Sequence, residues 1–272
     1  MNEKQLPTEQ TNTTESSFPT GGDLLLLLGA YLLFAAIIPS LSFALNALNL
    51  ELSYAGVEVL LINLTLLSLT ILFFEWYRRR REAPRPTICW RLKKPHLITI
   101  SAAIGATFTS GIVFEPLLSL LPDVDQQITL SVWMLLSTVV VAPVCEEYLC
   151  RGLLFGSLLR RYGAAPAVLL SALIFGAMHV LPLPAVNAFI IGILLAMSYL
   201  ATRSLWVPVL IHAANNLAAM LLYSAAPEED QLSLLLADRP ALYWAIYVAS
   251  FILFACSLLQ LIRASRKAST EW

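Results

Sequence analysis

Two adjacent glutamates and an arginine lie within a long apolar stretch of this chain. Glu146, Glu147 and Arg151 belong to the segment A-P-V-C-E-E-Y-L-C-R-G. A charge at the centre of a membrane helix costs roughly 2.5–3.5 kcal/mol on insertion scales, so charges at that depth are usually paired or functional. Glu147 and Arg151 have i,i+4 spacing and can pair on one helix face. Glu146 lies about 100° around the helix, and we expect it to face a cavity as a general base.

Two histidines and an asparagine lie in similarly apolar surroundings further along the chain. His179 follows Phe175, and Asn216 follows His212, each at i,i+4 spacing. At about 1.5 Å of rise per residue, these groups and Glu146 lie roughly 12–22 Å from the basic ends of their helices. Three helices can therefore present a carboxylate, two imidazoles and a carboxamide at one depth. In a dry site the glutamate is a competent base, while Asn216 could orient His212 or donate to a developing oxyanion.

The same groups raise the question of a metal ion. Glu146, His179 and His212 would make a three-ligand set for a divalent metal such as zinc, with one position left open. The zinc-protease motif H-E-x-x-H is absent. The four cysteines have no CxxC or zinc-ribbon spacing. At this point the sequence leaves open whether a metal takes part.

Some of the other polar residues have simpler interpretations. Cys150 lies one helical turn after Glu146, but a buried membrane cysteine is more often an apolar filler than a nucleophile. A buried pair such as Glu147–Arg151 more often positions its neighbours than takes part in chemistry. Glu115 is interpreted as part of a helix end.

The composition indicates what must position these residues. Of the 272 residues, 58% are hydrophobic and only 13% are charged, about half the charge of a soluble domain. Apolar runs near the roughly 20 residues that span a bilayer as helix predict an all-α polytopic membrane protein with about eight transmembrane helices. No part of the sequence has the basic composition of a surface that binds nucleic acid. The runs cover about 23–45, 54–76, 96–121, 128–159, 164–181, 185–201, 205–223 and 241–262. The fourth is longer than one crossing needs, so we expect it to be tilted or broken at Pro143.

Positive charges alternate between the loops. Basic residues follow the second, fourth, sixth and eighth runs, whereas the intervening loops are acidic or nearly free of positive charge. The positive-inside rule requires this pattern for eight helices with both termini in the cytoplasm. The run Arg78–Arg81 is interpreted as a topology determinant that contacts anionic lipid. We expect an integral membrane protein of the plasma membrane.

Taken together, the three polar clusters resemble the signature of the CPBP family of intramembrane proteases, which includes the type II CAAX prenyl endopeptidases and bacteriocin-processing relatives. The family's motifs are E-E-x-x-x-R, F-x-x-x-H and H-x-x-x-N. Here they read Glu146 to Arg151, Phe175 to His179 and His212 to Asn216, in the same order. One such motif alone is weak evidence, but three in order, each in a membrane helix, are specific. Cys150 stands where an apolar aromatic is common.

The resemblance implies hydrolysis of a peptide bond within the membrane. Glu146, helped by His179, would activate water, and His212 and Asn216 would stabilise the tetrahedral oxyanion. The substrate would be a peptide or a membrane protein, prenylated in the best-known relatives. The family has been interpreted both as metalloproteases and as glutamate proteases. Composition and apolar runs predict a disordered polar tail (1–22), N-terminal transmembrane helices (23–127) and a last transmembrane helix with a basic tail (224–272), and the resemblance implies a CPBP protease core between them (128–223).

Two alternatives come from other functional classes. Buried acids and histidines could relay protons in an ion-coupled transporter, although no repeat relates the two halves of the sequence. A non-catalytic membrane scaffold or immunity protein could also keep the motif residues. The G-x-S-G and G-x-G-D sites of serine and aspartyl intramembrane proteases are absent.

Overall fold

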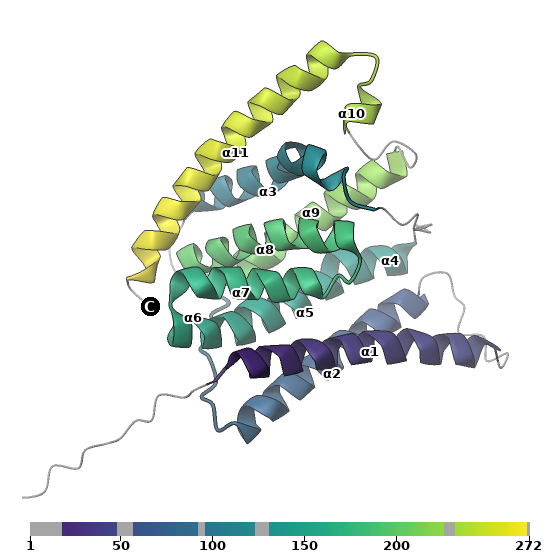
Figure 1. Cartoon of the computed structure of the whole chain (residues 1–272), viewed down its shortest axis with the longest axis vertical. Coiled ribbons are helices and arrows are strands. Elements are labelled where there is room, and N and C mark those ends of the chain that lie inside the picture. Colours follow the sequence, from purple (N-terminus) through teal and green to yellow (C-terminus); the bar gives the residue numbers. More distant parts are fainter. Residues whose placement is uncertain (1–17, 48–56, 92–95, 123–130, 226–231, 271–272) are drawn as a thin grey trace, which may run out of the picture.

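The computed structural model describes residues 18–47, 57–91, 96–122, 131–225 and 232–270. The described residues form helices and contain no strand, which confirms the all-α prediction (Figure 1). Outside the long helix that carries the glutamates, the helices are α1 (Gly21–Ala47), α2 (Val57–Arg80), α3 (Leu97–Leu118), α7 (Ala164–Ala177), α8 (Pro182–Thr202), α9 (Trp206–Ala225), α10 (Leu232–Leu235) and α11 (Pro240–Ser269).

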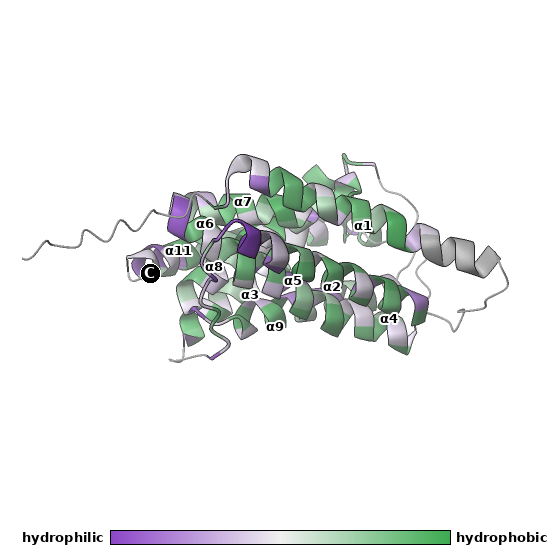
Figure 2. Cartoon of the chain, turned by 90° about the horizontal axis from the view of Figure 1, so that it is seen from below, coloured by the Kyte–Doolittle hydropathy of each residue, from purple (hydrophilic) through white to green (hydrophobic). Residues whose placement is uncertain are grey.

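Seven helices in the described part of the chain are long and apolar enough to cross a membrane. Hydrophobic residues cover most of their length (Figure 2). The fifth predicted run, 164–181, corresponds to α7, which has only 14 residues and is not among these seven. At about 1.5 Å per residue this helix reaches roughly 21 Å, less than the roughly 30 Å of a bilayer core. The polytopic architecture is therefore confirmed, with one helix shorter than the sequence predicts.

The run predicted to tilt or break at Pro143 is one continuous helix of 31 residues, Val132–Tyr162. Two wider, π-helical stretches interrupt its regular turns. Its parts are α4 (Val132–Leu136), η1 (Ser137–Val141), α5 (Ala142–Glu147), η2 (Tyr148–Phe155) and α6 (Gly156–Tyr162). Proline breaks a helix because its ring clashes with the preceding turn and it lacks an N–H. Here the π-helical turn before Pro143 widens the helix and changes the distance between the proline ring and the preceding turn, so the helix continues.

The helices form three groups (Figure 1). α1 and α2 pack together on one side, and α3 and α11 pack together on the other. The long helix, α7, α8 and α9 lie between them. Two glycines allow close contact between α7 and α8: a Cβ at Gly176 would lie 2.8 Å from the Ala185 carbonyl oxygen, and one at Gly192 would lie 3.1 Å from the Phe175 ring. This contact sets the distance between α8 and α7, which leads to His179.

The end of the predicted disordered tail is part of the fold. Residues 1–17 lie outside the described residues, but Phe18 is buried beside the rings of Phe74 and Tyr77. The Thr20 amide donates to the Asp23 carboxylate at 2.7 Å, and the Asp23 amide donates to the Thr20 hydroxyl at 3.1 Å. This reciprocal pair is a capping box that starts α1. The first helix therefore begins at Gly21, close to the start of the first predicted run at about residue 23.

The basic segment after α2 packs against the core. A Cβ at Gly156 would lie 2.7 Å from Pro86, so that glycine makes room for the segment. The Leu205 amide donates to the Cys89 carbonyl at 2.8 Å. Arg85 donates to the Tyr148 hydroxyl at 3.0 Å and lies 3.1 Å from Glu75, and these two contacts raise the pKa of Arg85. The segment thus fastens the long helix to the turn between α8 and α9.

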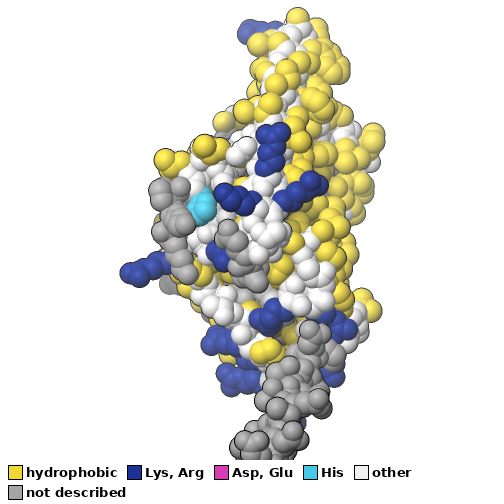
Figure 3. Space-filling model, turned by 90° about the vertical axis from the view of Figure 1, so that its left-hand side faces the viewer, with side chains coloured by type: hydrophobic (Ala, Val, Ile, Leu, Met, Phe, Trp, Pro, Cys, Tyr) yellow, Lys and Arg dark blue, Asp and Glu magenta, His cyan; other side chains and the backbone are white. Residues whose placement is uncertain are grey.

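Basic side chains gather at one end of the molecule (Figure 3). The last turns of α2, α6 and α11 all contain Arg or Lys, and all three helices end on the left-hand side of Figure 1. The Arg160 side chain donates to the Pro84 carbonyl at 3.1 Å, and that of Arg203 donates to the Ala268 carbonyl at 3.2 Å. These contacts link separate basic segments at the same end.

Candidate active site

The predicted pairing of Glu147 with Arg151 is confirmed. Nη1 of Arg151 lies 2.8 Å from Oε1 of Glu147, and both side chains are completely buried. Nη2 of Arg151 donates to the Gly192 carbonyl on α8 at 2.8 Å. The guanidinium carbon lies 4.5 Å from the centre of the Phe175 ring on α7. One arginine therefore connects the long helix to both α7 and α8.

The buried ring of His212 lies between the two glutamates. Its Nδ1 is 3.1 Å from Oε1 of Glu147, and its Nε2 is 3.9 Å from Oε2 of Glu146. Because an ionised carboxylate only accepts hydrogen bonds, Nδ1 is assigned as the protonated nitrogen. Glu147 therefore orients the His212 ring, a role that the sequence suggested for Asn216.

Glu146 has a different environment from its neighbour. Its side chain is 16% exposed, whereas that of Glu147 is completely buried. Among the described residues no lysine or arginine forms an ion pair with Glu146. Its distance of 3.9 Å to His212 is too long for a direct hydrogen bond. The Glu146 carboxylate is thus the one in this pair that is partly exposed and can accept a hydrogen bond from water.

His179 lies just beyond α7, and its half-buried ring is held by its own backbone. Nδ1 lies 2.9 Å from the Phe175 carbonyl oxygen. Since a carbonyl only accepts, this nitrogen is assigned the proton and Nε2 is left as an acceptor. The Phe175 ring packs edge to face with His179 at 5.1 Å and with His212 at 5.5 Å between ring centres. Phe175 therefore contacts both imidazoles and Arg151.

Asn216 is hydrogen-bonded to the long helix. Its side-chain amide donates to the Thr138 carbonyl at 2.9 Å. In the π-helical turn the Ala142 amide bonds to the Ser137 carbonyl instead of that of Thr138. The next residue, Pro143, has no N–H. Asn216 thus replaces a donor that the backbone cannot supply. The sequence does not predict this partner, although a proline that directly follows an irregular helical turn is a signal for such a free carbonyl.

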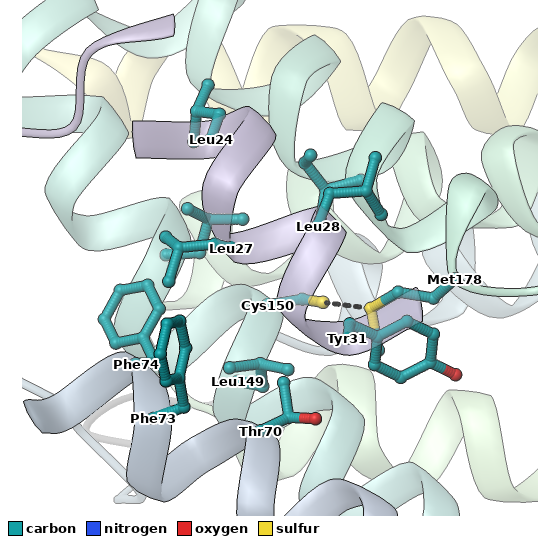
Figure 4. A pocket seen from close by; sticks show the side chains of 12 residues that line it. Leu24, Leu27, Leu28, Tyr31, Thr70, Phe73, Phe74, Leu149, Cys150 and Met178 are labelled. Carbon is teal, nitrogen blue, oxygen red and sulfur yellow. Dashed lines mark hydrogen bonds between the residues drawn. The ribbon is translucent and has the colours of Figure 1, made fainter. Parts of the chain in front are cut away.

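Cys150 does not have the surroundings of a nucleophile. Its side chain is completely buried, and Sγ lies 3.9 Å from Sδ of Met178. The neighbouring cavity, about 30 Å³ in volume, has mostly apolar walls from α1, α2, η2 and α7, and Tyr31 of α1 lies beside the two sulfur atoms (Figure 4). A reactive cysteine needs an exposed, electropositive site that stabilises the thiolate. The interpretation of Cys150 as an apolar filler fits this environment.

The possible metal ligands do not fit a metal site as they are arranged. No group of three His, Cys, Asp or Glu side chains within the described ranges could hold a metal ion. Glu146 and His212 approach each other, but His179 does not complete a three-ligand set with them. The Nδ1 atoms of both histidines are already hydrogen-bonded. The suggested ligand set of Glu146, His179 and His212 is therefore not supported by this arrangement.

Comparison with known proteins identifies the segment that holds these groups. Residues 128–218 match the family described as type II CAAX prenyl endopeptidase Rce1-like. This segment, about a third of the chain, resembles the protease core of the CPBP family. This family is one of intramembrane peptidases, and the matched segment includes every residue of the three motifs. No curated protein and no solved structure matches the chain. α1, α2, α3 and α11 lie outside the matched residues.

Proposed function

We propose that this protein is an intramembrane endopeptidase in which Glu146 activates the attacking water. One observation carries the proposal: Oε2 of Glu146 lies 3.9 Å from Nε2 of His212, while Glu147 is bonded to Arg151 and to the other nitrogen of that ring. A water about 2.8 Å from both Glu146 and His212 would fit this separation. Glu146 can thus act on the water while Glu147 holds Arg151 and His212 in place.

The proposed reaction uses only the chain's own groups. Glu146 accepts a proton as the water oxygen bonds to the scissile carbonyl carbon, and the carbonyl oxygen becomes an oxyanion. His212 keeps Nδ1–H on Glu147, and when Nε2 has also taken up a proton from solvent, Nε2–H donates to the oxyanion. Asn216 has a second amide hydrogen for the same purpose. The proton then passes to the leaving amine nitrogen as the carbon–nitrogen bond breaks, and His179 assists this transfer through Nε2.

A cleavage assay tests this proposal. The purified protein in liposomes is incubated with internally quenched peptides, with and without a prenylated cysteine near the C-terminus. We expect cleavage by the wild type and a loss of about 10²–10⁴ in kcat/KM for Glu146→Gln and for His179→Ala, a range typical of general acid–base groups. Adding a chelator to the same assay tests metal dependence. The two peptide sets test whether prenylation matters.

Cys150→Ala is the matched control, because Cys150 lies in the same helix and its side chain is completely buried. We expect this variant to cleave at nearly the wild-type rate. Circular dichroism and gel filtration establish that all variants remain folded. Cleavage by folded Glu146→Gln at the wild-type rate would remove Glu146 from the mechanism. Loss of cleavage in Cys150→Ala alone would point to a cysteine nucleophile.

A further inference from the structure

A second cavity lies on the other side of α8 and α9 from the candidate active site. It has a volume of about 420 Å³, and its walls come from α3, α8, α9 and α10. On α9, Asn215 lines this cavity while the next residue, Asn216, bonds to the long helix. On α8, Ile191 lines it while Gly192 bonds to Arg151. The two sites therefore use different faces of the same helices.

Glu115 is a buried carboxylate in the wall of this second cavity. It belongs to the membrane-spanning helix α3, and it is 8% exposed. Oε1 of Glu115 accepts a hydrogen bond from the Ser233 amide at 2.8 Å. Within the described part of the chain, Glu115 forms no ion pair with any Lys, Arg or His. Glu115 lies in the last turn of α3, and a carboxylate that is buried there without a cation is costly, so a cationic partner would stabilise it.

Two carboxamides share the cavity with Glu115. Asn187 of α8 and Asn215 of α9 both line it, and neither side-chain amide has a hydrogen-bond partner among the described residues. The chain following α3 and α9 contains Asp123, Asp125, Glu228, Glu229 and Asp230, with no Lys or Arg between 119 and 131 or between 226 and 238. Arg239 is paired with Asp238 at 3.4 Å. The sequence that directly follows α3 and α9, two of the helices that line the cavity, is therefore acidic, which favours a positively charged ligand.

We propose that this cavity binds an amphipathic amine. The ammonium group would pair with Glu115, the carboxamide oxygens of Asn187 and Asn215 would accept its remaining hydrogens, and a hydrocarbon body would lie against the apolar walls. Sites for small organic ligands typically have about 300–1,000 Å³ and mostly apolar linings with a few polar groups. A bare metal ion would leave most of the 420 Å³ unfilled. The proposal is independent of the peptidase activity.

Binding of dodecylamine to the full-length protein in detergent tests the proposal. Dodecanol and dodecanoate are the comparison ligands, because they share the hydrocarbon chain and differ in charge. Native mass spectrometry gives stoichiometry and affinity, and thermal unfolding gives the shift in Tm. We expect one dodecylamine to bind the wild type about tenfold more tightly than dodecanol does, which corresponds to about 1.4 kcal/mol. Glu115→Gln should bind both ligands equally.

Glu58→Gln is the charge-matched control, because Glu58 lies in the first turn of α2 and does not line the cavity. We expect it to retain the preference for dodecylamine. Dodecanol binding by Glu115→Gln at the wild-type level shows that the cavity is intact in that variant. Equal affinity of the wild type for all three ligands would overturn the proposal. An equal loss of dodecylamine affinity in Glu115→Gln and Glu58→Gln would overturn it as well. Sodium or calcium ions are tested in the same way. If such an ion displaces dodecylamine, and if it stabilises the wild type but not Glu115→Gln, the proposal is overturned in favour of an inorganic cation.

Discussion

At the residue scale, two adjacent glutamates have become chemically distinct. Glu147 is completely buried and accepts from both Arg151 and His212, whereas Glu146 is partly exposed and makes no direct hydrogen bond to any residue that the structure describes. The difference arises because consecutive helical residues point in directions about 100° apart. The Glu147 carboxylate can therefore orient His212 and balance the charge of Arg151, and the Glu146 carboxylate is available for a reacting water.

Substitution of Glu147 tests its structural importance. We expect Glu147→Ala to lower the free energy of unfolding by about 3–5 kcal/mol, because it leaves the Arg151 guanidinium buried without its partner. Glu147→Leu combined with Arg151→Met should cost less, since Oε2 of Glu147 and Nε of Arg151 lack hydrogen-bond partners in the described part of the chain. Unfolding in mixed micelles measures both. A double variant less stable than Glu147→Ala would contradict this account.

At the element scale, the irregular turns of the long helix decide where its side chains and carbonyls point. The η1 turn carries the helix past Pro143 and leaves the Thr138 carbonyl to a side chain of α9. π-helical turns are frequent at functional sites. Here one such turn couples the position of Asn216 to the helix that bears both glutamates.

This coupling predicts a compensating pair of substitutions. Asn216→Ala should cost about 1–3 kcal/mol of stability, because it leaves the Thr138 carbonyl without a donor. Pro143→Ala supplies a backbone N–H there, so the cost of Asn216→Ala should be smaller in the Pro143→Ala background. A double-mutant cycle based on unfolding measures the coupling, which should exceed about 0.5 kcal/mol.

Asn215→Ala is the matched control for this cycle, because the neighbouring Asn215 lines the second cavity and its side chain makes no hydrogen bond in the described ranges. Its effect on stability should be the same with proline or alanine at position 143. Strict additivity of the Asn216 and Pro143 substitutions would mean that the Thr138 carbonyl is satisfied in another way.

At the scale of the whole molecule, charge is separated along the membrane helices. Basic side chains gather where α2, α6 and α11 end (Figure 3). The opposite ends of α3 and α9 are followed by acidic segments. Cytoplasmic loops of membrane proteins carry the excess of Lys and Arg. This distribution predicts that the basic end and the C-terminus face the cytoplasm.

Cysteine labelling on either end of α11 tests this orientation. In a cysteine-free background, Asp238→Cys should react with a membrane-impermeant maleimide in intact cells, while Lys267→Cys should react only after the membrane is permeabilised. Both positions are exposed, so a difference in labelling reports the side of the membrane. The reverse pattern would invert the topology.

The sequence by itself determined the membrane class, the helical architecture, most helix positions and the polar residues of the candidate site. Each depends on local quantities: the free energy of moving apolar residues into lipid, the length of apolar runs, and i,i+4 spacing as for Glu147 and Arg151. Only the tertiary structure decided that Glu147 orients His212, that Asn216 bonds to Thr138, that α7 is short, and that Glu115 lines a cavity. These features depend on helix rotation, on irregular turns and on contacts between distant segments, which no local pattern specifies.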